Sequence, residues 1–457
     1  MFERKIIRLL DDWAGKTQRK PLVLRGARQV GKTSAVTVFS KGFDQYAYLN
    51  LDRPEDRNLF ENDLPFQVLL DRLFFLNRIE KNDGRTLIFI DEIQNSPRAV
   101  NLLRYFYEDT PKLYVIAAGS LLESVIDNQI SFPVGRVEYL AMHPCSFDEY
   151  LKASGEDRAL ALLDQLPVPE YAQPRLDELF RQYAAVGGMP EVVASYIENR
   201  DLVKLGSIYD SLITAYLDDV EKYGRNTTLS HVIRHIIRSS FRFAGQRIKF
   251  EGFGNSNYRS REIGDSFRTL EKAMLLQLVY PAINTRLPMN VKYRIPKLQL
   301  LDTGLVNHMI GLQVELLGAR SIEDSWKGKI AEHITGQELF ASENSVLAKL
   351  NYWLRDVRNS QAEVDFVMSF QNLLIPVEVK SGSSGRLKSL HLFMEMAPHP
   401  WAVRICSGKM NLENVVTPAG KKYSLINVPF YLAGRIRNVL EYFTGNKPDS
   451  IPAGNRI

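Results

Sequence analysis

The feature that most constrains this chain is a glycine-rich segment near its start. Residues 26–33 read Gly-Ala-Arg-Gln-Val-Gly-Lys-Thr and fit the pattern G-x-x-x-x-G-K-[ST]. The apolar run Leu22–Leu24 precedes the segment, and the helix-compatible run Ser34–Phe39 follows it. This strand–loop–helix order is what a phosphate-binding loop requires, so the sequence predicts an α/β nucleoside-triphosphatase fold with a parallel sheet.

The residue types in this loop suit contact with a triphosphate. Glycines let the backbone approach phosphate oxygens, and the N–H groups at the start of the following helix point toward the anion. We expect Lys32 to contact the β- and γ-phosphates and the Thr33 hydroxyl to bind Mg²⁺. The expected nucleotide-binding residues of the loop are Gly26, Ala27, Arg28, Gln29, Val30, Gly31, Lys32, Thr33 and Ser34.

A second strand is expected to complete the nucleotide site. Residues 86–90 are an unbroken apolar or β-branched run, typical of a buried parallel strand, and Asp91 and Glu92 follow directly. We expect Asp91 to hold Mg²⁺ and Glu92 to polarise the attacking water, which would make the site hydrolytic.

Two further residues are candidates for contact with the γ-phosphate. Ser120 follows the strand-like run Leu113–Ala118, where a polar residue commonly senses the γ-phosphate; an N-cap of the next helix is the alternative. Arg136 lies on a later loop and is a candidate charge stabiliser, in cis or from a neighbouring subunit. The alternative for Arg136 is an ordinary surface arginine.

The ordered set of motifs resembles a large family of bacterial and archaeal AAA-type ATPases. In that family a C-terminal domain of unknown function, related to restriction endonucleases, follows the ATPase. The resemblance covers nearly the whole chain and implies ATP as the nucleotide, a helical lid, and a possible homo-oligomer. It rests on residues 24–33, 90–94, 118–120, 135–138, 144–150, 186–191 and 301–305.

Length and composition indicate several domains. At 457 residues the chain exceeds what a single hydrophobic core usually serves. We expect a P-loop ATPase core at 1–150, a helical lid at 151–224, a basic winged helix-like domain at 225–305 and a nuclease-like domain at 306–457. No run of about 18 apolar residues occurs, and the two cysteines, Cys145 and Cys406, have no metal-site spacing. A cytoplasmic protein with buried thiols and no membrane partner is expected.

One segment accounts for the basic character of the chain. Residues 225–297 hold 14 Lys and Arg against four Asp and Glu, whereas the whole chain has a net charge of +5. Helical patterns at 229–241 and 258–277 precede strand-like runs at 276–283 and 297–301, the order of a winged helix-turn-helix. DNA is the expected partner, and a winged helix that binds only protein is the alternative. The expected DNA contacts are Arg259, Arg261, Arg268, Lys272, Arg286 and Lys292.

The C-terminal part contains a nuclease-like arrangement of charged residues. Alternation along residues 361–368 places Glu363 and Asp365 on one strand face, and alternation along 373–380 does the same for Glu378 and Lys380. Asp365 and Glu378 would bind Mg²⁺ or Mn²⁺, and Lys380 would orient the attacking water. Glu332, on a helix predicted over 326–339, would complete the metal shell. Ordinary surface strands, or a fold retained for binding without cleavage, are the alternatives.

These observations predict an ATP-hydrolysing AAA-type ATPase whose nucleotide state governs engagement of DNA. Two other functions remain open at this point. The first is an ATP-gated, metal-dependent endonuclease that uses Asp365, Glu378 and Lys380. The second is a switch that binds a protein partner through its basic helices.

Overall fold

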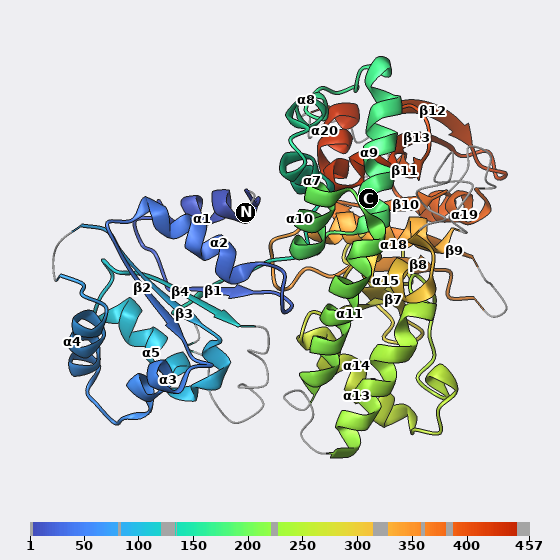
Figure 1. Cartoon of the computed structure of the whole chain (residues 1–457). Helices are drawn as coiled ribbons and strands as arrows, with labels where there is room; N and C mark the ends of the chain where they lie inside the picture. The colour runs from blue at the N-terminus through green and yellow to red at the C-terminus, as the bar shows by residue number, and fades with distance from the viewer. Residues whose placement is uncertain are drawn as a thin grey trace, which may run out of the picture.

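The chain forms an α/β structure built around two β-sheets (Figure 1). The computed structural model describes residues 3–80, 84–119, 133, 135–220, 227–313, 328–357, 362–380 and 387–445. The amino-terminal sheet and its helices lie on one side of the molecule, and the remaining helices pack with the second sheet on the other side (Figure 1).

The amino-terminal sheet is fully parallel, as the sequence predicts. Its strand order is β2-β3-β4-β1-β5. The strands are β1 (Leu22–Arg25), β2 (Gln45–Asn50), β3 (Thr86–Asp91), β4 (Tyr114–Gly119) and β5 (Glu138–Ala141). All six residues of β3 are buried, because helices cover both faces of this central strand.

Among the described residues, five helices cover the two faces of this sheet. The helices on one face are α1 (Ile6–Ala14) and α2 (Lys32–Phe39), and those on the other are α3 (Pro54–Glu61), α4 (Phe66–Leu76) and α5 (Pro97–Glu108). Alternate strand residues supply the two cores: Leu87 and Phe89 pack toward α1 and α2, while Ile88 and Ile90 pack toward α3–α5.

A helical region follows the first sheet. Its helices are α7 (Phe147–Ala153), α8 (Asp157–Leu162), α9 (Gln173–Val186), α10 (Pro190–Asn199) and α11 (Leu202–Asp218). A capping box between Ser146 and Glu149 begins α7, and Pro190 begins α10. The helices therefore start at residues whose chemistry favours a helix start.

The basic segment forms two helices and an antiparallel pair of strands. They are α13 (Thr227–Ser240), α14 (Ser260–Lys272), β6 (Leu276–Ala282) and β7 (Lys297–Leu300). Strand β6 also pairs in parallel with β8 (Asn351–Leu354), so the pair belongs to a larger sheet and is not a free hairpin. Hydrogen bonds between strands therefore cross the boundary expected near residue 305.

The second sheet is mixed and has the order β12-β13-β11-β10-β9-β8-β6-β7. Its other strands are β9 (Glu363–Phe370), β10 (Leu373–Val379), β11 (Trp401–Cys406), β12 (Asn411–Val416) and β13 (Lys422–Pro429). The accompanying helices are α15 (Thr303–Ile310), α18 (Lys329–Ala341), α19 (Lys388–Met396) and α20 (Ile436–Thr444). The turn at Gln371 between β9 and β10 takes a left-handed φ of 47°, which closes the antiparallel pair.

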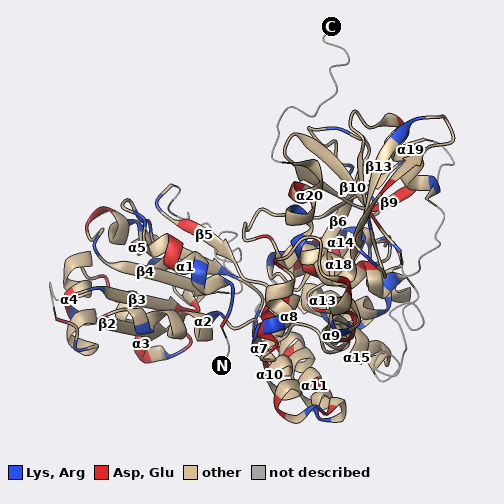
Figure 2. Cartoon of the chain, turned by 90° about the horizontal axis from the view of Figure 1, so that it is seen from above, with Lys and Arg blue, Asp and Glu red and all other residues tan. Residues whose placement is uncertain are grey.

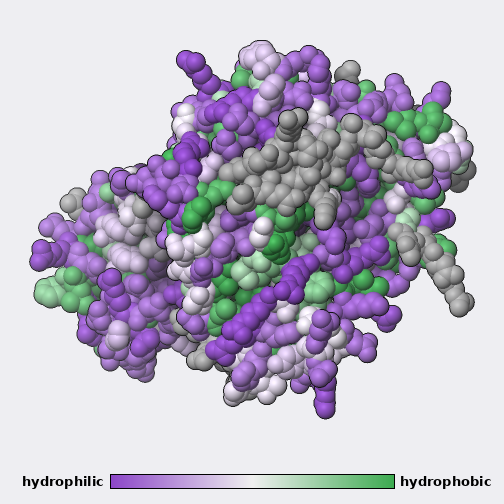
Figure 3. Space-filling model, turned by 45° about the vertical axis from the view of Figure 1, so that its right-hand side comes forward, coloured by the Kyte–Doolittle hydropathy of each residue, from purple (hydrophilic) through white to green (hydrophobic). Residues whose placement is uncertain are grey.

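Charged positions of both signs are interspersed along most elements (Figure 2). The face in Figure 3 is largely hydrophilic, with hydrophobic residues gathered near its middle. Among the described residues, no helix combines the length and apolar character needed to cross a bilayer. Cys145 and Cys406 are both buried, as expected.

Candidate functional site

The glycine-rich loop connects β1 to the start of α2. Gln29 and Gly31 have left-handed backbone angles, with φ of 65° and 94°. Gly31 immediately precedes α2, so the loop turns sharply and directs the first N–H groups of the helix toward the cavity that the loop lines. A side chain at Gly26 would clash, because its Cβ would lie 2.5 Å from the carbonyl oxygen of Met142. The glycines therefore serve backbone geometry and close packing.

Lys32 is the first residue of α2, and its ammonium lies inside the loop. Nζ donates hydrogen bonds to the carbonyl oxygens of Gly26 and Ala27, each at 2.9 Å. Burial lowers the pKa of Lys32, and the nearby carboxylates of Glu92 and Asp91 act against that shift. The loop thus holds a desolvated cation next to the N-terminus of α2, an arrangement that favours a bound anion.

Thr33 and Asp91 meet at the carboxyl end of β3. The Thr33 hydroxyl donates to Asp91 Oδ2 at 2.6 Å, and the Tyr48 hydroxyl donates to the same oxygen at 3.4 Å. Asp91 is the last residue of β3 and is buried. A hydroxyl and a carboxylate are the hard oxygen donors that Mg²⁺ prefers, so these two residues fit a magnesium site.

Glu92 follows Asp91 and takes a left-handed φ of 51°, so β3 ends at Asp91. Its carboxyl group lines the same cavity as Lys32 and accepts a hydrogen bond from Gln94. Burial raises the pKa of Glu92. A carboxylate with a raised pKa is a stronger proton acceptor, as a general base requires.

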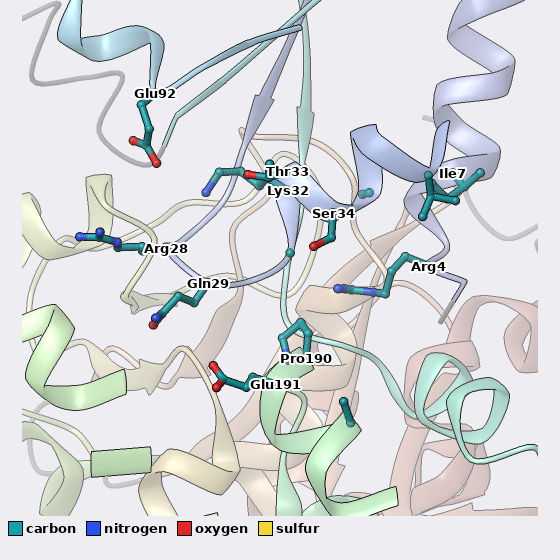
Figure 4. A pocket seen from close by; sticks show the side chains of 14 residues that line it. Arg4, Ile7, Arg28, Gln29, Lys32, Thr33, Ser34, Glu92, Pro190 and Glu191 are labelled. Carbon is teal, nitrogen blue, oxygen red and sulfur yellow. The ribbon is translucent and has the colours of Figure 1, made fainter. Parts of the chain in front are cut away.

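Lys32, Thr33 and Glu92 line one cavity of about 510 Å³ between the first sheet and α10. Figure 4 shows Lys32 and Glu92 on one side and Glu191, whose carboxylate points toward the loop, on the other. The lining residues are Arg4, Ile7, Arg28, Gln29, Gly31, Lys32, Thr33, Ser34, Ala35, Val38, Glu92, Pro190, Glu191 and Ala194. The helical region therefore supplies one wall of the cavity.

Two lining arginines have structural roles that sequence reasoning missed. Arg4 donates to Glu149 Oε1 at 2.8 Å and to the carbonyl oxygen of Val30 at 2.9 Å, so it connects the loop to α7. Arg28 forms an ion pair with Asp219, directly after α11. No local motif indicates either pairing, because the partners lie 145 and 191 residues away along the chain.

The other predicted nucleotide contacts are placed differently. The side chains of Ala27 and Val30 are buried beneath the loop, which leaves only their backbone groups for contact with a nucleotide. Arg136 lies outside the cavity lining, where its Nε is 2.9 Å from Glu108 Oε1 in an exposed ion pair. Ser120 lies outside the described residues. The structure thus assembles the loop, Asp91 and Glu92, and it does not bring Arg136 to them within one chain.

The predicted DNA contacts do not form one cluster of unpaired cations. Arg259 and Arg261 are exposed at the start of α14, and Arg268 forms an ion pair with Asp265 at 2.6 Å. Lys272, at the end of α14, is half-buried, and Arg286 is exposed in the β6–β7 connection. Lys292 pairs with Asp356 at 2.7 Å.

The predicted nuclease-like residues meet where α18, β9 and β10 lie together. Asp365 Oδ2 accepts a hydrogen bond from the Val379 N–H at 2.8 Å, and Glu378 Oε1 is 2.5 Å from Lys380 Nζ. Burial, with the charge on Asp365, raises the pKa of Glu332 and of Glu378 to about 8. Sequence reasoning missed Lys297, whose Nζ is 3.0 Å from Glu332 Oε2 and 3.3 Å from Asp365 Oδ1.

This acidic group does not fit a divalent metal as it stands. Both oxygens of Asp365 and one oxygen of Glu378 already have partners. Within the described ranges, no three His, Cys, Asp or Glu residues are grouped as a metal ion would need. We therefore assign no metal-dependent step to the C-terminal residues.

Comparison with protein families identifies the domain that contains the first of these groups of residues. A family profile described as "AAA domain" matches residues 18–151, the range that contains the loop, Asp91 and Glu92. This part of the chain is an AAA-type P-loop ATPase domain. Two domains of unknown function follow the AAA domain: DUF8612 matches residues 177–316 and DUF4143 matches 327–429.

Solved structures that align with this chain come from several organisms. The Walker-type ATPase of Pyrococcus abyssi aligns over 68% of this chain and 96% of its own, at 16% identity and a TM-score of 0.45. The RuvB Holliday junction branch migration motor of Thermotoga maritima aligns over 64% and 93%, at 13% identity and a TM-score of 0.25. The ORC1 protein of Aeropyrum pernix, solved in complex with DNA, aligns over 68% of this chain and 93% of its own, at 14% identity and a TM-score of 0.25. No protein with a curated description matches this sequence.

Proposed function

We propose that this chain hydrolyses ATP in its AAA domain and that the bound nucleotide governs its engagement of DNA. The observation that supports hydrolysis is one cavity lined by the phosphate-binding loop, Thr33 and Glu92, with Asp91 hydrogen-bonded to Thr33 beside it. Passive nucleotide binding needs the loop alone, whereas hydrolysis also needs a group that activates water.

The roles follow from the positions of the side chains. Lys32 and the N-terminus of α2 bind the phosphates, and Glu92 orients the attacking water and accepts its proton. Thr33 and Asp91 are the residues that would hold Mg²⁺. When bound, this ion neutralises negative charge on the phosphates. Arg136 would contribute only from a neighbouring subunit of a homo-oligomer.

The helical region offers a route from the nucleotide to the rest of the chain. Pro190 and Glu191 line the cavity, and Arg28 in the loop pairs with Asp219 at the far end of α11. A bound phosphate competes with Asp219 for Arg28, because both are anions. Nucleotide binding would therefore alter the contact between the AAA domain and α11.

Exposed arginines support DNA as the partner. Arg259 and Arg261 lie at the start of α14, within the most basic segment of the chain. Because β6 lies inside a sheet, we propose α14 and the β6–β7 connection, not a free wing, as the contact surface. Phosphate contacts of this kind give an affinity that falls steeply with salt.

The proposal is tested by measuring ATP turnover with and without linear, forked and single-stranded DNA. We expect turnover in the wild type, its loss in Glu92→Gln, and stimulation by one form of DNA. Filter binding over a salt series separates DNA from other partners. Failure to bind any DNA at low salt would instead support a switch that binds a protein partner.

The meeting of Asp365, Glu378 and Lys380 keeps a metal-dependent nuclease as a second candidate, although most carboxylate oxygens of this group already have partners in the chain. Incubation of plasmid and branched DNA with Mg²⁺ or Mn²⁺, in the presence of ATP, tests this candidate. Cleavage by the wild type but not by Asp365→Ala would support it. Absence of cleavage with every metal and substrate would leave ATP hydrolysis with DNA binding.

A further inference from the structure

The acidic group of the C-terminal part surrounds a lysine from outside the predicted nuclease motif. Lys297 is the first residue of β7, and only 5% of its side chain is exposed. Its Nζ lies 3.0 Å from Glu332 Oε2, 3.1 Å from Glu363 Oε1 and 3.3 Å from Asp365 Oδ1. One ammonium therefore contacts carboxylates from α18 and β9 together.

The remaining oxygens of this group have little capacity for a metal ion. Lys380 binds Glu378 Oε1, and Arg247 Nε lies 2.6 Å from Glu363 Oε2. Among the described residues, only Glu378 Oε2 is a buried carboxylate oxygen of this group without any hydrogen bond or ion pair. Even if all four carboxyl groups are counted as ionised, they face three cations, so most of their negative charge is matched within the chain.

We infer that Lys297 supplies from within the chain the positive charge that a divalent cation supplies in a metal-dependent nuclease. Mg²⁺ needs about six oxygen ligands at ~2.1 Å, with several carboxylate or water oxygens free to approach it. An ammonium in the middle of the carboxylates repels a second cation and takes up their oxygens as hydrogen-bond acceptors. The group therefore closes as a metal-free ion-pair cluster that joins β7, α18 and β9.

This cluster also lies at one end of a helix that contacts the helical region. Glu332 is near the start of α18, and Glu338 farther along the same helix accepts a hydrogen bond from the Phe147 N–H at the start of α7. The ion pairs of Lys297 thus fix the start of α18. Their role in this account is to hold elements together, and it does not depend on ATP hydrolysis.

The test measures Mn²⁺ binding to the full-length chain without nucleotide, with electron paramagnetic resonance as the readout. All variants carry Asp91→Asn, which removes the carboxylate of the nucleotide site as a source of bound metal. We expect the chain with Lys297 intact and the chain with Asp365→Asn to bind the same small amount of Mn²⁺. Lys297→Met should lower the melting temperature, and Mn²⁺ should then bind and restore most of the loss.

Two further variants sharpen the result. Lys297→Arg keeps the positive charge, so it should stay free of Mn²⁺ and melt close to the parent chain. The double variant Lys297→Met/Asp365→Asn should lose the Mn²⁺ rescue, because a ligand is gone.

Two results would overturn the inference. The first is Mn²⁺ binding to the chain with Lys297 intact that Asp365→Asn abolishes. The second is a folded Lys297→Met variant that gains no Mn²⁺ site. If Lys297→Met does not fold, the comparison of the parent chain with Asp365→Asn decides alone, because unequal binding contradicts the inference and equal binding supports it.

Discussion

The carboxylate of Asp302 accepts a hydrogen bond from the backbone N–H of Gly188, with 2.5 Å between Oδ2 and N. Its other oxygen accepts from the Leu305 N–H at 3.0 Å and caps α15. Because Gly188 precedes α10, which supplies Pro190 and Glu191 to the nucleotide cavity, this side chain ties the cavity wall to the C-terminal half.

Removal of that carboxylate should destabilise the fold strongly. We expect Asp302→Ala to lower the free energy of unfolding by about 3 kcal/mol, because buried N–H groups lose their acceptor. Urea unfolding of the whole chain measures this loss. The control is Asp12→Ala at an exposed helical position, expected within about 0.5 kcal/mol of the wild type. Equal losses in the two variants would show that the contact contributes nothing.

Stability should also depend on pH through Glu338. This side chain is buried and accepts hydrogen bonds from the Tyr183 hydroxyl at 2.6 Å and from the Phe147 N–H at 3.0 Å. Burial raises its pKa to about 8, against about 4.3 in an unfolded chain. Between these values the folded state holds a proton that the unfolded state releases. The stabilisation is therefore complete below about pH 4.3 and is lost as the pH rises through about 8.

The variant Glu338→Gln isolates this effect because an amide does not titrate in this range. We expect the free energy of unfolding of the wild type, relative to Glu338→Gln, to decrease steadily from about pH 5 to about pH 8. Denaturant titrations at several pH values give this difference. A difference that stays constant, or that increases with pH, would contradict the protonated state of Glu338.

Substitutions of the two members of the Arg28–Asp219 ion pair should change the affinity for nucleotide in opposite directions. Arg28 lines the cavity, so we expect Arg28→Ala to weaken Mg-ATP binding by about 10-fold, the value of one charge-assisted contact. Asp219→Asn releases Arg28 toward the phosphates and should tighten binding. Titration calorimetry on both single variants and the double variant measures the coupling. If Asp219→Asn still tightens binding when Arg28 is also replaced, competition for this arginine is excluded.

The DNA surface can be tested through the salt dependence of binding. Each phosphate contact contributes about 0.9 to the slope of log affinity against log salt. Replacement of both Arg259 and Arg261 by alanine should therefore lower the slope by about 2. The matched control replaces Arg104 and Lys112, two exposed cations of the AAA domain, and should leave the slope unchanged. Equal changes in both pairs would point to net charge alone.

The strand and helix on either side of the glycine-rich loop, and the buried strand β3, were predictable because their sequence signals are local. The loop, the buried strand β3 and the acidic pair after it are contiguous segments, and strand and helix periods place their side chains without tertiary information. The order of α13, α14, β6 and β7 was predictable for the same reason. The pairing of β6 with β8 was not, because strand pairing across about 70 residues depends on packing that no local period encodes.

The residues missed by sequence reasoning share one property, namely a single charged side chain that finds its partners far along the chain. Arg4, Asp219 and Lys297 lie outside any recognisable motif. Their partners are Glu149, Arg28 and the Glu332–Asp365 cluster. Only Lys297 has a weak sequence signal, because it opens a strand-like run in which leucines occupy positions 298, 300 and 301. Ion pairs of this kind become visible only when the fold brings the elements together.

The measurement that tests the central claim most directly is Mg-ATP binding and turnover by the wild type, Lys32→Ala and Glu92→Gln. We expect the wild type to bind and hydrolyse ATP, and Lys32→Ala to bind at least 10-fold more weakly. Glu92→Gln should retain binding but lose turnover by about 100-fold or more, as expected when a general base is removed. A wild type that gives no binding signal, or variants that bind and turn over ATP like the wild type, would contradict the account.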